Sequence, residues 1–347
     1  KTAANEKDSP ANKALKKGLI QKINQKPNSM VFSEMLIWVY MQESNWSAAF
    51  IQVRALDRRL TEDARRVYNL AETLANNKEY AVAADAFEYV VKIGKKSQYY
   101  VESRIGGLMV RYNQLAEGGS IDSLALVDLI ADFDATINLF GKTEGTSTLL
   151  RKKAHVQCFY QHKLEEGLDT FEEALSINGI SPHQLAEIKL EYGDALLAAG
   201  YIWDASLVYG QVDKGFKYDY LGEMAKLKSS KVHFYTGNFD LAKAQLDILK
   251  GATTKLIAND AMLLSVIITD NSTVDTSTVP LKLYADADLL IFQNRLLEAR
   301  GKLDSIKAIF PGHALEDEML MLRYEMAMKE KEYQVGTGFL EDIKALY

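Results

Sequence analysis

A short block that ends in alanine recurs along the chain, and it constrains the fold more than any other feature. The block reads GNFDLA up to Ala242 and GYIWDA up to Ala205, and further copies end at Ala49, Ala83 and Ala299. The spacing is 34 residues from Ala49 to Ala83 and 37 from Ala205 to Ala242. A repeat of this length indicates stacked structural units that each contact only their neighbours.

The sizes of the side chains around each alanine repeat as well. Twelve residues before the alanine the side chain is small in four copies, at Ala71, Gly193, Ser230 and Ala287, and Ile37 is the exception. Four residues after it stand Val53, Phe87, Tyr209, Leu246 and Leu303, and seven residues after it Leu56, Val90, Val212, Leu249 and Ile306. This pattern predicts a helix hairpin, in which a small residue of the first helix makes room where the alanine of the second helix crosses it. One hairpin cannot bury its apolar face, so neighbouring hairpins must stack.

Two more copies and two departures complete the predicted order of units. Gly167 and Gly336 occupy the alanine position in the additional copies, whereas 57 residues separate Ala242 from Ala299. The surplus predicts an extra helix and a polar, flexible loop. The expected division is 1–27, the second helix of a truncated preceding repeat; 28–97, two units; 98–145, a divergent helical pair; 146–251, three units; 252–279, the extra helix and loop; and 280–347, two units.

These residues resemble the tetratricopeptide repeat (TPR) family, whose unit of about 34 residues has the same alternation of small and large side chains. The resemblance implies an all-α, TPR-like α-solenoid of stacked antiparallel helix hairpins that forms a right-handed superhelix. Stretches such as AFIQVRALDRRL and KLIANDAMLLSVIITDN also resemble long exported TPR proteins of Bacteroidetes. That resemblance implies a location in the periplasm or cell envelope, with a role in envelope assembly or secretion.

TPR arrays typically act as non-catalytic scaffolds, and the concave groove formed by their first helices holds a peptide or a partner helix. The groove positions of the family correspond here to Arg65, Tyr68 and Glu72; Lys152, Phe159 and Tyr160; Glu187, Glu191 and Asp194; Lys231 and Tyr235; and Tyr284 and Asp288. Aromatic side chains among charged ones suit recognition, because the rings supply contact area and the charges set the register. The alternative for the aromatic residues is that they pack between repeats.

Charge and hydropathy exclude two classes of partner. The net charge is −6, and residues 1–100 hold only 16 Lys and Arg against 11 Asp and Glu, too small an excess for a nucleic-acid-binding domain. No apolar run reaches the ~18 residues of a membrane helix. Cys158 is the single cysteine, so an internal disulfide is excluded. The sequence begins at Lys1 and not at Met, so the lack of a signal peptide says nothing about export.

One group of residues has the spacing of metal ligands. His155, Cys158 and His162 would share one face of a continuous helix, within reach of one Zn²⁺. A fourth ligand is not evident, and His155 occupies the small-residue position twelve before Gly167. The favoured interpretation is therefore a half-buried histidine and an inert, buried cysteine. No motif places a histidine beside a nucleophile, so we predict neither a catalytic residue nor a cofactor.

The sequence thus predicts a scaffold that binds a protein or peptide. The alternative is a helical-repeat protein that encloses a small molecule or lipid; a deep apolar pocket would favour it and a long charged groove would oppose it. The opening helix ALKKGLIQKIN resembles the second half of a repeat. We therefore expect a piece of a longer array, whose apolar end faces can self-associate.

Overall fold

The computed structural model describes residues 10–27, 29–60, 63–117, 123–273 and 277–346. This part of the chain contains eighteen α-helices, one π-helical turn and no strand. It divides into two compact units, Lys1–Lys153 (unit 1) and Ala154–Tyr347 (unit 2), and one helix crosses the division. Unit 1 contains α1 (Pro10–Gln25), α2 (Met30–Gln42), α3 (Trp46–Leu60), α4 (Arg65–Asn76), α5 (Tyr80–Ile93), α6 (Tyr100–Glu117), α7 (Ser123–Phe140) and most of α8 (Glu144–His155).

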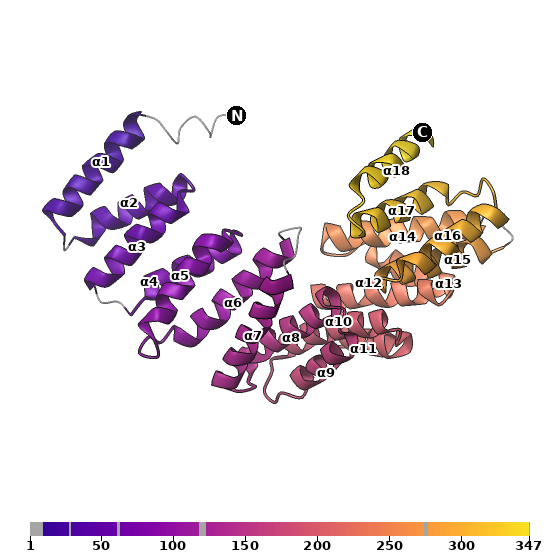
Figure 1. Cartoon of the computed structure of the whole chain (residues 1–347), viewed down its shortest axis with the longest axis horizontal. Helices are drawn as coiled ribbons and strands as arrows, with labels where there is room; N and C mark the ends of the chain where they lie inside the picture. The colour runs from indigo at the N-terminus through magenta and orange to yellow at the C-terminus, as the bar shows by residue number, and fades with distance from the viewer. Residues whose placement is uncertain (1–9, 28, 61–62, 118–122, 274–276, 347) are drawn as a thin grey trace. The chain divides into compact units, whose positions relative to one another are not determined.

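Unit 2 continues with helices of the same kind. They are the π-helical turn η1 (Val156–Tyr160), α9 (Leu164–Leu175), α10 (Pro182–Ala199), α11 (Ile202–Gly215), α12 (Tyr220–Tyr235), α13 (Phe239–Leu249), α14 (Lys255–Thr273), α15 (Val279–Phe292), α16 (Leu296–Ile309), α17 (Glu316–Lys329) and α18 (Tyr333–Leu346). Most helices pack chiefly on the next helix in the chain, as antiparallel hairpins (Figure 1). The helices α10, α12, α15 and α17 also contact one another in that order and form one layer of unit 2. The predicted TPR-like solenoid of stacked helix hairpins is confirmed within each unit.

The turns inside the hairpins share one backbone conformation. Each contains a residue with a positive φ exactly where the repeat phase places it, five residues before the recurring alanine or glycine. The pairs are Ser44 and Ala49, Lys78 and Ala83, His162 and Gly167, Gly200 and Ala205, Gly237 and Ala242, Asn294 and Ala299, and Lys331 and Gly336. In six of them an N–H donates to the carbonyl five residues back, as from Tyr201 to Leu196 at 2.9 Å. This closure terminates the first helix, because the left-handed residue turns the chain away from the helix axis.

The recurring residues form the core between the helices. The five elbow alanines have no exposed surface, and the large residues four and seven positions after them are buried too. The contact at the small residue of the first helix, however, differs from the predicted contact with the alanine. A methyl group built on Gly193 of α10 would overlap the ring of Tyr209, which stands four residues after Ala205. In that hairpin the small residue therefore makes room for the large side chain of the second helix and not for the alanine.

The hairpin of α8 and α9 contains one residue more than the others. At its end the N–H of Lys163 donates to the carbonyl of Gln157, six residues back, at 2.8 Å. The π-helical turn η1 accommodates the extra residue. As a result Cys158 faces Gly167, where an added methyl group would overlap its Sγ. The side chain that faces this elbow is thus that of Cys158, whereas the repeat phase of the sequence places His155 at the small-residue position.

The extra residues between α13 and α15, which lengthen the spacing from Ala242 to Ala299, form mainly a helix. The helix α14 extends to Thr273, so the polar residues 269–273 belong to it and not to a loop, and residues 274–276 lie outside the described part. Asn271 is 3% exposed, and its Nδ2 donates to the carbonyl of Ile267 at 2.9 Å. The hydroxyl of Ser265 donates to Asp247 of α13 at 3.0 Å, which fixes α14 to its neighbour. Neither α14 nor another described helix is long and apolar enough to span a membrane.

Candidate partner-binding face of unit 2

Three helices of one layer in unit 2 each contribute a pair of side chains four residues apart. The pairs are Lys231 and Tyr235 on α12, Tyr284 and Asp288 on α15, and Glu325 and Lys329 on α17, and we call them the inner cluster. A spacing of four residues puts both members of a pair on the same helix face. Since α12 contacts α15 and α15 contacts α17, the three faces adjoin. The first two pairs were predicted from the sequence; the third was not.

Two tyrosines form the base of the inner cluster. Tyr235 is 5% exposed and Tyr284 is 6% exposed. The ring of Phe234 lies edge-on to that of Tyr284, at 6.3 Å between centroids, and 5.7 Å from that of Phe239. These ring contacts fix the position of the tyrosines within the core of unit 2. Lys231, Glu325 and Lys329 are exposed and form the rim.

Asp288 joins the base to the rim. The hydroxyl of Tyr235 donates a hydrogen bond to its carboxylate. Burial raises the pKa of Asp288, while the charges of Lys231 and Lys329 and the hydrogen bond from Tyr235 act in the opposite direction. The carboxylate is therefore held in a site that disfavours its charge unless cations lie nearby.

Acidic side chains outnumber basic ones around Tyr284. Burial raises the pKa of its hydroxyl, and the charges of four carboxylates raise it further, those of Asp288, Glu318, Glu325 and Asp317. Within the described part of the chain this hydroxyl makes no hydrogen bond. Glu325 reaches solvent, yet partial burial, and then the charge of Asp288, raises its pKa as well.

The two lysines of the rim differ in what they contact. Burial lowers the pKa of Lys329, and its Nζ donates to the carbonyl of Ile291 near the end of α15 at 2.6 Å. A cation at this position satisfies a carbonyl in the last turn of a helix. Lys231 is exposed on α12. The cluster therefore presents an aromatic base, a local excess of negative charge and a basic edge.

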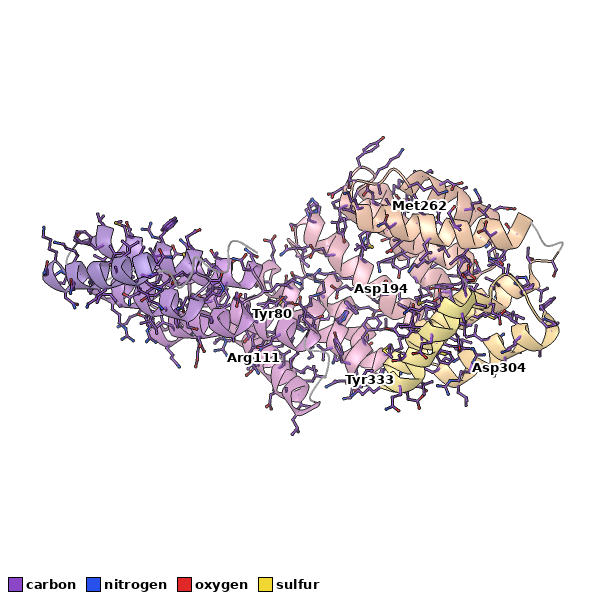
Figure 2. The ribbon with its side chains drawn as sticks, turned by 90° about the horizontal axis from the view of Figure 1, so that it is seen from above. Tyr80, Arg111, Asp194, Met262, Asp304 and Tyr333 are labelled. Carbon is purple, nitrogen blue, oxygen red and sulfur yellow. The ribbon has the colours of Figure 1, made fainter. Side chains whose placement is uncertain are left out.

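The structure places the other predicted groove residues of unit 2 outside the inner cluster. Asp194 of α10 is labelled in Figure 2. It accepts hydrogen bonds from the Tyr209 hydroxyl at 2.7 Å and from Lys228 Nζ at 2.8 Å. Glu191 lies 3.2 Å from Nδ1 of His155, and both are half-buried. These two carboxylates thus connect helices of the fold.

The remaining residues of this set are half-buried. The ring of Phe159 lies 6.5 Å from that of Phe292, and the ring of Tyr160 lies 5.7 Å from that of His155. Glu187 is half-buried on α10. Packing between repeats, the alternative to groove exposure, thus accounts for the two aromatic residues.

Four predicted groove residues lie in unit 1. Arg65 and Glu72 are exposed on α4, and Tyr68 between them stacks on Tyr99 with 4.8 Å between ring centroids. Lys152 lies over the ring of Tyr112, 5.0 Å from its centroid. Burial, and then the charges of Glu72 and Glu102, raise the pKa of the Tyr68 hydroxyl, so this face of unit 1 has an aromatic and acidic group of its own.

The three candidate metal ligands do not share a helix face. The helix α8 ends at His155, the π-helical turn holds Cys158, and His162 lies beyond it with a φ of 56°. Cys158 is 2% exposed, burial raises the pKa of its thiol to about 12, and its Sγ donates to the carbonyl of Leu164 at 3.8 Å. Among the residues described, no three or more His, Cys, Asp or Glu residues are grouped closely enough to hold a metal ion.

Comparison with known proteins finds similarity among solved structures. No protein-family model and no curated protein matches the sequence. The chain is similar to a tetratricopeptide repeat protein from Parabacteroides merdae, with 9% identity, a TM-score of 0.43 and coverage of 82% of this chain and 93% of that one. It is also similar to the human IFIT1 dimer with m7Gppp-AAAA, with 12% identity, a TM-score of 0.41 and coverage of 96% and 73%. The fold assigned above rests on the chain's own helix packing and elbows.

Proposed function

We propose that this chain is a non-catalytic scaffold and that the inner cluster of unit 2 binds a segment of a partner protein. In this proposal a lysine or arginine side chain of the partner lies on Tyr284, between Asp288 and Glu325. The observation that carries it is the convergence of three helix faces on Tyr284, a residue only 6% exposed whose hydroxyl makes no hydrogen bond within the described residues and whose pKa is raised by burial and by the charges of four carboxylates.

The chemistry of the cluster favours a basic side chain. A cation is attracted to the face of an aromatic ring and forms charge-assisted hydrogen bonds with carboxylates. A nearby cation would also offset the factors that raise the pKa of Asp288 and Glu325, namely burial and, for Glu325, the charge of Asp288, because it stabilises the charged carboxylates. Lys231 and Lys329, at the edge, would attract an acidic residue elsewhere in the same segment and so set its direction.

The other classes of function find less support in this face. An excess of carboxylates repels a nucleic acid, whose phosphates need basic partners. A lipid would need an apolar lining, whereas four of the six residues of the inner cluster are charged. Catalysis would need an activated nucleophile, and the thiol of Cys158 is buried with a raised pKa.

A peptide-display selection tests the proposal without knowledge of the natural partner. The protein is immobilised, random linear peptides are selected on it, and one enriched peptide is synthesised for titration against Asp288→Asn and Glu325→Gln. We expect the enriched peptides to share a lysine or arginine, and each variant to bind at least about tenfold more weakly, as the loss of a hydrogen bond between charged groups predicts.

The matched control is Glu341→Gln, which removes an exposed carboxylate from α18. It should bind the peptide like the unmodified protein, and circular dichroism should show equal helix content in all variants. Peptides without a basic residue, or unchanged binding by Asp288→Asn, would contradict the proposal.

A further inference from the structure

Unit 1 contains a cavity that belongs to no predicted groove. It has a volume of about 420 Å³ and lies between α5, α6 and α7. One face of α6 forms its floor, with Ser103, Arg104 and Gly107 among the lining residues. The helices α6 and α7 pack less closely than the other hairpin partners in unit 1, which leaves this space open.

Two adjacent glycines shape the floor in different ways. At Gly106 the ring of Phe87 on α5 approaches so closely that an added methyl group would lie 2.7 Å from its Cζ. At Gly107 a methyl group would meet only Cβ of Phe87, at 3.4 Å. Gly106 thus allows α5 to pack against α6, and Gly107 keeps the floor free of a side chain beside Phe87 and Leu108. Phe87 and Leu108 are 1% and 6% exposed, so the apolar surface inside the cavity belongs chiefly to the half-buried Ala84 and Val91 of α5.

The cavity contains one arginine whose terminal nitrogens have no partner. Nε of Arg104 donates to the hydroxyl of Thr136 on α7 at 3.0 Å, and its two Nη atoms make no hydrogen bond within the described residues. The second arginine, Arg111, labelled in Figure 2, is paired with Asp132 of α7. The bond to Thr136 holds the guanidinium of Arg104 in a fixed orientation, as a carboxylate receptor requires.

Two further polar groups in the lining lack partners in the part of the chain described. Ser103 has no exposed surface and its hydroxyl makes no hydrogen bond. Buried hydroxyls normally have a partner, so an unsatisfied one indicates a missing ligand or water. Asp85 of α5 also lines the cavity and makes no ion pair, whereas the neighbouring Glu88 pairs with Lys92 at 2.7 Å.

We propose that this cavity binds a zwitterion of amino-acid size with an apolar side chain. Its carboxylate would pair with the Nη atoms of Arg104, its ammonium group with Asp85, and its side chain would pack on Ala84 and Val91. Such a ligand uses the unpaired cation, the unpaired anion and the apolar part of the lining. The proposal concerns unit 1 alone and is independent of the peptide site in unit 2.

Three probes that differ by one charged group test the proposal. They are L-phenylalanine, 3-phenylpropionate, which lacks the ammonium group, and 2-phenylethylamine, which lacks the carboxylate. We expect calorimetric titration of the full chain to show L-phenylalanine binding at least about tenfold more tightly than either analogue.

Variants assign each charge to its residue. Arg104→Gln should bind L-phenylalanine no more tightly than 2-phenylethylamine. Asp85→Asn should bind L-phenylalanine no more tightly than 3-phenylpropionate. Gly107→Met should abolish binding by filling the cavity, and Arg58→Gln, which removes an exposed arginine from α3, should bind normally. Circular dichroism checks that each variant is folded. The proposal is wrong if L-phenylalanine does not bind, if an analogue binds as tightly, or if Arg104→Gln binds it unchanged.

Discussion

The ring of Tyr209 on α11 covers Gly193 on α10 so closely that a methyl group at Gly193 would lie 2.9 Å from the ring carbon Cδ1. We therefore expect Gly193→Ala to lower the free energy of unfolding by about 1–3 kcal/mol through overpacking. In Gly210→Ala, on the outer side of α11, the new methyl group meets nothing within 4 Å, so the higher helix propensity of alanine should raise stability by up to ~1 kcal/mol. Urea unfolding of the two variants measures both changes, and equal effects would contradict this packing.

The elbow conformation leads to a second prediction. Gly200 has a φ of 92°, and a methyl group there would meet nothing within 4 Å, so only the backbone would resist a side chain. Gly200→Ala should cost about 1–2 kcal/mol, the usual price of a left-handed non-glycine residue. Lys331 holds a similar conformation at 63°, and Lys331→Gly should be neutral or stabilising. An unchanged free energy of unfolding for Gly200→Ala in urea would contradict this prediction, because the elbow backbone would then adopt another conformation without cost.

The single thiol should be unreactive in the folded protein. Burial raises the pKa of Cys158 to about 12, and the thiolate is the reactive form. We expect iodoacetamide at pH 8 to leave the native protein unmodified and to label it fully in urea, as mass spectrometry can measure. Equal labelling rates in the two states would mean that the α8–α9 hairpin is open.

The carboxyl of Glu318 on α17 should make stability depend on pH. Burial raises its pKa to about 8, and neighbouring Asp317 and Asp270 of α14 act in the same direction. The folded protein therefore keeps a proton that the unfolded chain releases near pH 4.5, so stability falls as pH rises from about 4.5 to about 8. Unfolding free energies of Glu318→Gln should show a shallower fall across this range.

The control for this pH effect is Glu341→Gln on α18, which removes an exposed carboxylate. It should keep the pH dependence of the unmodified protein. If the free energy of unfolding of Glu318→Gln falls with pH as steeply as that of the unmodified protein, other groups cause the decrease in stability.

The hairpins and their phase could be predicted from the sequence because one alanine position organises each of them. Side-chain size at fixed distances from Ala205 or Ala242 determines which residues are buried, and the elbow needs one left-handed residue five positions earlier. The π-helical turn was not predicted, because the one-residue shift that it causes is no larger than the variation in spacing between copies, from 34 to 37 residues. The division into repeat units and the cell-envelope location stay predictions.

The candidate site was predicted in part. Lys231, Asp288 and Glu325 all lie eleven residues before the elbow residue of their repeat, so the column that identified the first two also contains the third. Glu325 was missed although the repeat phase already places Gly336 at the elbow position of its repeat. Asp194 occupies the same column but binds Tyr209 and Lys228, a pairing between helices that the column itself does not reveal.

A reciprocal charge swap is the most direct measurement of the proposed binding face. The peptide selected on the unmodified protein and its variant with lysine or arginine changed to glutamate are each titrated against the unmodified protein and Asp288→Lys. Only the like-charged pairings should fail, so the unmodified protein should bind the basic peptide and Asp288→Lys the acidic one. Equal binding of both peptides to both proteins would contradict a salt bridge to Asp288 and with it the proposed docking of a basic side chain.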